Sequence, residues 1–128
     1  MDQSKSREWD LARILIVEDE GLISMMLEDW LVELKHKPVG PAETLAQALE
    51  MARESEIDAA ILDLHLRSER ADSVADIFIA RGIPFAISSG SSTQEIEQRF
   101  AGRPVMSKPF DFSIVERVVA TLVVCITG

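Results

Sequence analysis

Several features are scarce or absent in this chain of 128 residues, and each of these absences excludes some classes of protein. It has one cysteine, Cys125, which excludes an internal disulfide and fits a reducing compartment, and we expect this residue to be at least half-buried. The longest apolar run, VERVVATLVVCITG, carries two charges and falls short of the roughly 20 residues of a membrane span. The start, MDQSKSREWD, lacks the apolar segment of a secretory signal. We therefore expect a cytoplasmic protein with a flexible head at residues 1–11 and one domain at 12–128.

Basic residues and aromatic residues are also scarce. The 13 Lys and Arg residues against 22 Asp and Glu give a net charge of −9. This excess of negative charge argues against binding nucleic acid or an anionic membrane through bulk electrostatics. Aromatic residues make up 5% of the chain, and there is no tyrosine. The hydrophobic share is nevertheless 47%, which is enough for a packed core and argues against disorder.

Apolar runs of strand length alternate five times with stretches of helical periodicity. The runs lack strict polar alternation, which is typical of parallel strands covered on both faces. Short connections and right-handed crossovers then favour a doubly wound α/β sheet with five strands and five helices. We expect strands at residues 14–17, 37–42, 59–62, 83–89 and 103–107, and helices at 21–35, from 45, at 71–81, at 92–100 and after 111.

Several helix ends carry recognisable signals. Thr44 with Gln47, and Ser92 with Glu95, have the spacing of capping boxes. Gly82 is placed to end the helix of residues 71–81. The apolar face of the first helix is predicted to consist of Leu22, Ile23, Met26, Leu27, Trp30, Leu31 and Leu34.

Polar residues follow the predicted strands at their carboxyl ends. In an open parallel sheet the ligand site lies beyond these ends, so we expect the side chains to converge on one rim. They are Glu18, Asp19 and Glu20 after the first strand, Asp63 after the third, Ser88, Ser89 and Gly90 at the fourth, and Ser107, Lys108 and Pro109 at the fifth.

Carboxylates clustered at a buried edge are costly unless a cation or a proton neutralises them. Oxygen ligands of this kind suit Mg²⁺, which takes one or two carboxylates together with phosphate oxygens. A lysine beside them can hold a dianionic group as a point charge, and a hydroxyl can hydrogen-bond one of its oxygens. The set therefore predicts a phosphoryl site with a divalent metal, because phosphoryl transfer needs mainly positioning and charge neutralisation.

Four motifs in order carry a resemblance: Glu18-Asp19, Asp63 in AAILDLHL, Ser89-Gly90, and Lys108 in SKPF. Over residues 13–126 the chain resembles the receiver domain of bacterial two-component response regulators. It is most similar to stand-alone receivers of alphaproteobacterial type, which serve phosphorelays or general stress signalling. With this resemblance we expect the flavodoxin-like strand order 2-1-3-4-5.

The resemblance implies a role for each residue of the rim. Asp63 is the implied phospho-acceptor and a direct Mg²⁺ ligand. Asp19 is a second direct ligand, and Glu18 acts directly or through a water. The backbone carbonyl of His65 completes the protein's share of the metal shell.

The phosphoryl group itself is assigned to two further side chains by resemblance. Lys108 takes the phosphate-binding role, and the Lys108–Pro109 bond is expected to be cis. The family places its hydroxyl directly before a small residue, so we favour Ser89, which precedes Gly90, and leave Ser88 open.

The chain also departs from the family. Three residues before Lys108 the family usually has an aromatic side chain that swings inward on activation, whereas Val105 stands here. Glu18 replaces a common aspartate, and the loop after Asp63 lacks a Pro-Gly turn. We therefore expect a different output geometry.

The predicted function is a stand-alone receiver that is no enzyme beyond its own phosphorylation and dephosphorylation. Its implied partners are a sensor histidine kinase or a histidine phosphotransfer protein, a downstream protein, and a second copy bound weakly through the last helix. A phosphate-independent pseudo-receiver is the alternative. A phosphatase of the haloacid dehalogenase kind needs a second acid where His65 stands, and no Gly-rich nucleotide loop is present.

Overall fold

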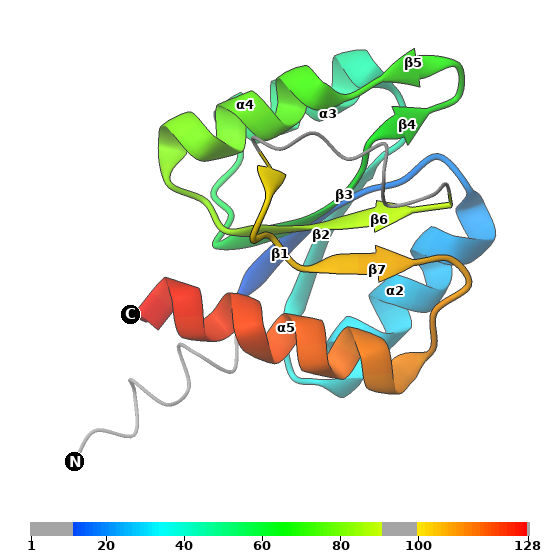
Figure 1. Ribbon diagram of the computed structural model, residues 1–128, viewed down its shortest axis with the longest axis vertical. Helices are drawn as coiled ribbons and strands as arrows, with labels where there is room; N and C mark the ends of the chain where they lie inside the picture. The colour runs from blue at the N-terminus through cyan, green and yellow to red at the C-terminus, as the bar shows by residue number, and fades with distance from the viewer. Residues whose placement is uncertain (1–11, 91–99, 128) are drawn as a thin grey trace.

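The computed structural model describes residues 12–90 and 100–127, and its centre is a five-stranded parallel sheet (Figure 1). The sheet order is β2-β1-β3-β6-β7, with every neighbouring pair parallel. Counted along the chain, these strands have the order 2-1-3-4-5, so the predicted topology is confirmed. The strands are β1 (Arg13–Val17), β2 (Lys37–Ala42), β3 (Ala59–Asp63), β6 (Phe85–Ser89) and β7 (Val105–Ser107).

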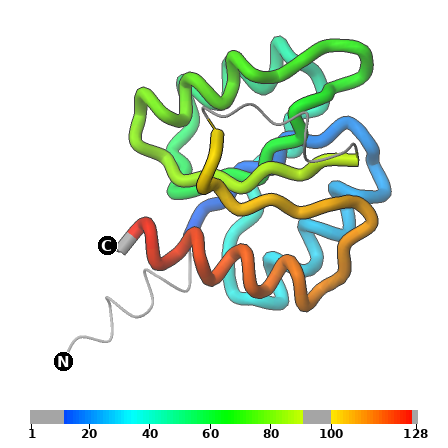
Figure 2. The backbone as a smooth tube through the Cα atoms, viewed as in Figure 1, coloured from blue at the N-terminus to red at the C-terminus, as the bar shows by residue number. Residues whose placement is uncertain are grey.

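Helices cover both faces of this sheet, as the ribbon and the backbone tube show (Figures 1 and 2). The pair α3 and α4 lies on one face, and the pair α2 and α5 lies on the other. None of the helices described here is long and apolar enough to cross a membrane. Their bounds are α2 (Gly21–Glu33), α3 (Leu45–Glu54), α4 (Asp72–Arg81) and α5 (Phe112–Thr127). The helix predicted at 92–100, with its Ser92 and Glu95 box, falls almost entirely outside the described residues, as does the predicted head at 1–11.

The central strands β1, β3 and β6 are buried on both sides, and because side chains alternate between the two faces of a strand, successive residues face different helix layers. Leu62 packs in the cluster under α3 and α4, whereas its neighbour Ile61 packs under α2 and α5. The same alternation holds in β6 for Ile87 and Ala86. This alternation decides on which face of the sheet each polar residue at the strand ends lies.

Two of the predicted helix ends lie in the described part, and both are confirmed. Gln47 N donates to Thr44 Oγ1 at 3.1 Å, and Thr44 N donates to Gln47 Oε1 at 3.3 Å, which is the reciprocal capping box. Gly82 ends α4 in the left-handed conformation with φ of 71°.

Three details differ from the sequence-based expectations. The loop after Asp63 contains a small antiparallel pair, β4 (His65–Leu66) with β5 (Glu69–Arg70), and strands of two residues are too short to leave a periodic pattern. Leu22 is 72% exposed, because a helix turns by about 100° per residue and Leu22 falls outside the face centred on Leu27 and Leu31. Cys125 is exposed rather than half-buried.

Candidate functional site

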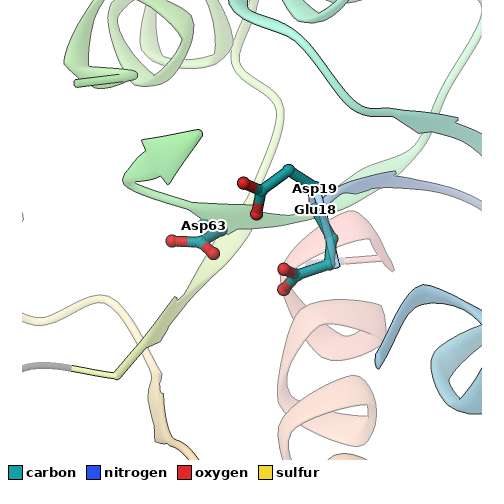
Figure 3. Close-up of side chains that lie close together, drawn as sticks. All are labelled: Glu18, Asp19 and Asp63. Carbon is teal, nitrogen blue, oxygen red and sulfur yellow. The ribbon is translucent and has the colours of Figure 1, made fainter. Parts of the chain in front are cut away.

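The rim at the carboxyl ends of β1, β3 and β7 brings together the predicted acidic residues and the predicted lysine. Carboxylate oxygens of Glu18, Asp19 and Asp63 lie within 4.8 Å of one another. Figure 3 shows these three side chains close together, two from the segment after β1 and one from the end of β3. Lys108 reaches the same place from the segment after β7, since its Nζ lies 2.9 Å from Asp63 Oδ2.

Lys108 is shared among three carboxylates. Besides Asp63, its Nζ donates to Glu18 Oε2 at 3.3 Å and to Glu20 Oε1 at 3.3 Å. The Lys108 side chain is 15% exposed and that of Glu18 is 1% exposed, so their charges are largely removed from water. The Lys108–Pro109 bond is cis, as expected. The site thus has more negative than positive charge.

The pKa values of the site reflect this imbalance. Burial raises the pKa of Glu18 to about 7, and the negative charge of Asp63 adds to the rise, against the Glu20 N–H and Lys108, which lower it. For Lys108, burial alone would lower the pKa, but the hydrogen bond and charge of Asp63, followed by those of Glu18, outweigh burial and raise it. Lys108 is therefore a fixed positive charge, and Glu18 is a carboxylate that lacks sufficient neutralisation.

The donor set fits a divalent cation of the magnesium type. Glu18 Oε1 is buried and accepts no hydrogen bond within the described part of the chain, although Lys108 Nζ is 3.1 Å away. Three carboxylates within 4.8 Å provide oxygen ligands alone, which Mg²⁺ prefers. A cation held here would offset the burial and the repulsion by Asp63 that together raise the pKa of Glu18.

Two backbone N–H groups from the segment after β3 also reach the carboxylates. His65 N donates to Asp63 Oδ1 at 2.9 Å, and Arg67 N donates to Asp19 Oδ2 at 2.7 Å. The contact of Arg67 was not predicted, because a backbone contact across 48 residues leaves no signal in side-chain type or spacing. The contact between Glu20 and Lys108 was not predicted either. The metal-binding role of the His65 carbonyl stays a prediction.

No family model matches the chain. SdrG from Sphingomonas melonis Fr1 is 44% identical, with a TM-score of 0.76, over 93% of this chain and 98% of SdrG. The REC domain of the PhyR response regulator from Erythrobacter litoralis is 28% identical, with a TM-score of 0.77, over 89% of this chain and 91% of that domain. The chain belongs to the response-regulator receiver family.

The receiver domain of sensor histidine kinase PA1611 from Pseudomonas aeruginosa PAO1, solved with magnesium in its active-site cleft, shares the fold at 21% identity and a TM-score of 0.74, over 88% of this chain and 98% of that one. The transcriptional regulatory protein PdtaR from Mycobacterium tuberculosis is 31% identical over 105 residues. That match covers 79% of this chain but 51% of PdtaR, so the receiver spans about half the length of that relative.

The two serines of this receiver lie on opposite faces of β6. Ser88 is paired in register with Asp63, shares the face of Ala86, and its buried Oγ has no hydrogen-bond partner among the described residues. Ser89 is also buried, follows Ile87 in the alternation, and its carbonyl accepts the Lys108 N–H at 2.9 Å. The assignment of the hydroxyl role to Ser89 stays a prediction, with Ser88 open.

A cavity of about 410 Å³ adjoins Lys108 on the side of α2. Most of its wall is apolar, and its polar members are Glu20 and Lys108. It leaves open space beside the Lys108 side chain. The residues that line it are Glu20, Ile23, Met26, Gly90, Lys108, Pro109 and Phe110.

Proposed function

We propose that this receiver accepts a phosphoryl group on Asp63, with Mg²⁺ bound, from a sensor histidine kinase or a histidine phosphotransfer protein. The observation that carries the proposal is the contact of 2.9 Å between Asp63 Oδ2 and Lys108 Nζ, beside a cluster of three carboxylates. Asp63 supplies a carboxylate oxygen as the nucleophile, and the Lys108 ammonium lies within hydrogen-bond distance of the same carboxylate, where a transferred phosphoryl group would stand beside it.

Each side chain has a definite task in this reaction. An oxygen of Asp63 attacks the phosphorus, the bond from phosphorus to the donor's histidine nitrogen breaks, and an acyl phosphate forms. Lys108 then neutralises charge on the phosphoryl oxygens, and the Ser89 hydroxyl hydrogen-bonds one of them. Glu18, Asp19, Asp63 and the His65 carbonyl are the residues that would hold Mg²⁺. When bound, the ion would neutralise negative charge on these carboxylates and on the phosphoryl group.

The test is phosphorylation by acetyl phosphate with Mg²⁺, followed by intact mass measurement and hydroxylamine treatment. We expect one phosphoryl group that hydroxylamine removes, and none when a chelator takes the metal. Asp63→Asn should abolish the modification, whereas Asp29→Asn, at an exposed aspartate of α2, should leave it unchanged. An Asp63→Asn protein that is modified like wild type would show that the acceptor is another residue.

The output proposed for this chain is protein contact or phosphorelay in the cytoplasm, without nucleic acid or membrane binding. Val105 is half-buried in β7, where the family usually has an aromatic switch residue, so a phosphate-independent pseudo-receiver is the second candidate. Capture of partners with and without beryllofluoride, which mimics the acyl phosphate, separates the two. A partner set that depends on beryllofluoride supports the receiver, and an unchanged set supports the pseudo-receiver.

A second copy is a further proposed partner, bound weakly through α5. Val124 on this helix is 66% exposed and its neighbour Cys125 is also exposed, so the outer side of α5 presents adjacent apolar side chains for a contact. Sedimentation of wild type and Val124→Glu over a range of concentrations tests this, since the substitution should abolish any dimer formed through α5.

A further inference from the structure

The β4–β5 hairpin begins two residues after Asp63 and is fixed to the core at its base. Leu64, Leu66 and Ala71 are buried in the cluster under α3 and α4. Ala71 N donates to the Leu64 carbonyl at 2.8 Å, which closes the base. Each strand contributes only two residues, and a pair this short has little stability of its own.

The tip of the hairpin contacts the acidic site through its backbone. Arg67 N donates to Asp19 Oδ2 at 2.7 Å, while His65 N donates to Asp63 Oδ1 at 2.9 Å. Arg67 has φ of 60°, in the left-handed region that is unfavourable for a residue other than glycine. The turn that presents its N–H therefore needs support from contacts elsewhere.

Arg70 of β5 supplies contacts of this kind to two elements, β4 and α4. It lies opposite His65 in the register of the hairpin, and its Nη1 is 3.2 Å from His65 Nε2. Its Nε and Nη2 donate to the two carboxylate oxygens of Asp72, the first residue of α4, at 2.8 and 3.0 Å. A bidentate pair fixes the direction of the guanidinium plane as well as its position.

We propose that Arg70 is a positioning residue of the acidic site, which holds the β4–β5 hairpin so that Arg67 N–H fixes the Asp19 carboxylate for metal binding. The proposal deepens the proposed function, since it rests on Asp19 as a metal ligand. Hydrogen-bond partners that orient metal ligands typically change metal affinity by 10- to 100-fold when they are lost. Arg70 acts on Asp19 through the Arg67 N–H rather than directly, so we expect a change at the lower end of that range.

The experiment compares Arg70→Met with Arg53→Met. Both substitutions remove one positive charge and keep an unbranched side chain. Arg53 is exposed in the last turn of α3. This turn leads into the start of β3, so it lies near the amino ends of the strands, away from the acidic site at their carboxyl ends. In a Mg²⁺ titration followed by NMR, we expect Arg70→Met to raise the dissociation constant about tenfold. Arg53→Met should match wild type.

Two further measurements separate positioning from charge. In metal-free protein, the amide hydrogen of Arg67 should exchange faster in Arg70→Met than in wild type or Arg53→Met. Arg70→Lys keeps the charge and loses the planar fork, so its Mg²⁺ affinity should lie between those of wild type and Arg70→Met. Wild-type affinity together with wild-type exchange at Arg67 in Arg70→Met overturns the proposal.

The outcomes also separate this proposal from the proposed function. If Asp63→Asn is phosphorylated like wild type, the acceptor assignment is wrong, whatever Arg70→Met does. If wild type binds no Mg²⁺, the role of Asp19 as a ligand and the inference on metal positioning are both overturned. The exchange rate of the Arg67 amide then decides whether Arg70 holds the hairpin at all, because that measurement needs neither metal nor phosphate.

Discussion

The two sides of the acidic site are held by different kinds of contact. On one side the Lys108 ammonium meets Glu18 and Asp63 among side chains that are 15%, 1% and 7% exposed. On the other side an exposed hairpin supplies backbone N–H groups, and its ion pair joins Arg70 and Asp72, which are 41% and 17% exposed. Removing one partner of a buried pair is costly, whereas an exposed pair contributes little. The Lys108 side should therefore govern stability, and the hairpin side should govern ligand geometry.

The largest expected effect is that of Lys108→Met on stability. Without the lysine, Glu18 and Asp63 lose the cation that contacts both of them in a site largely removed from water. We expect the free energy of unfolding to fall by about 3 kcal/mol near neutral pH without metal. Urea unfolding measures this, and added Mg²⁺ should restore part of the loss because it replaces the missing charge. Lys37→Met, at an exposed residue of the edge strand β2, is the control; an equal loss there would contradict the prediction.

A second prediction concerns the pH dependence that Glu18 causes. Its pKa in the folded protein is about 7, above the ordinary value of 4.5, so between these values the folded protein binds more protons than the unfolded chain. The contribution of Glu18 to stability is therefore full at low pH and is lost as pH rises through 7. In Glu18→Gln, the free energy of unfolding should therefore fall by about 2 kcal/mol less than in wild type between about pH 5 and about pH 8.

Urea unfolding at several pH values, without metal, compares wild type with Glu18→Gln. Glu20→Gln is the matched control, since Glu20 contacts the same lysine but its side chain is 61% exposed. The control should keep the slope of wild type. A slope that is the same in all three proteins means that Glu18 is not the group responsible.

The sequence predicted the structure best where a pattern repeats over many residues. The β-α alternation predicted a doubly wound parallel sheet, and the family resemblance supplied its strand order. The positions of polar residues at the strand ends predicted that Asp63, Glu18 and Lys108 would meet. Short or non-periodic features could not be predicted from the sequence. The hairpin has two residues per strand, and the Arg67 contact to Asp19 uses only the backbone. Such contacts depend on tertiary placement, which no local pattern encodes.

A third prediction distinguishes Ser88 from Ser89, where a shift of one residue decides which face a side chain occupies. The Ser88 hydroxyl is buried without a hydrogen-bond partner among the described residues. Ser88→Ala should therefore raise the free energy of unfolding by about 1 kcal/mol without metal. Ser89→Ala should give no such gain and should instead shorten the lifetime of the acyl phosphate. A shorter lifetime in Ser88→Ala, with no gain in stability, would move the hydroxyl role to Ser88.

The smallest expected effect on stability is that of Arg70→Met. Its ion pair with Asp72 lies near water, where such pairs contribute about 0.5 kcal/mol. The base of the hairpin also keeps its buried residues Leu64, Leu66 and Ala71. Urea unfolding should therefore show a small loss and an unchanged dependence on urea concentration. If the loss instead equals that of Lys108→Met, the hairpin is part of the structural core, and weaker Mg²⁺ binding in Arg70→Met then reports partial unfolding rather than a misplaced Asp19.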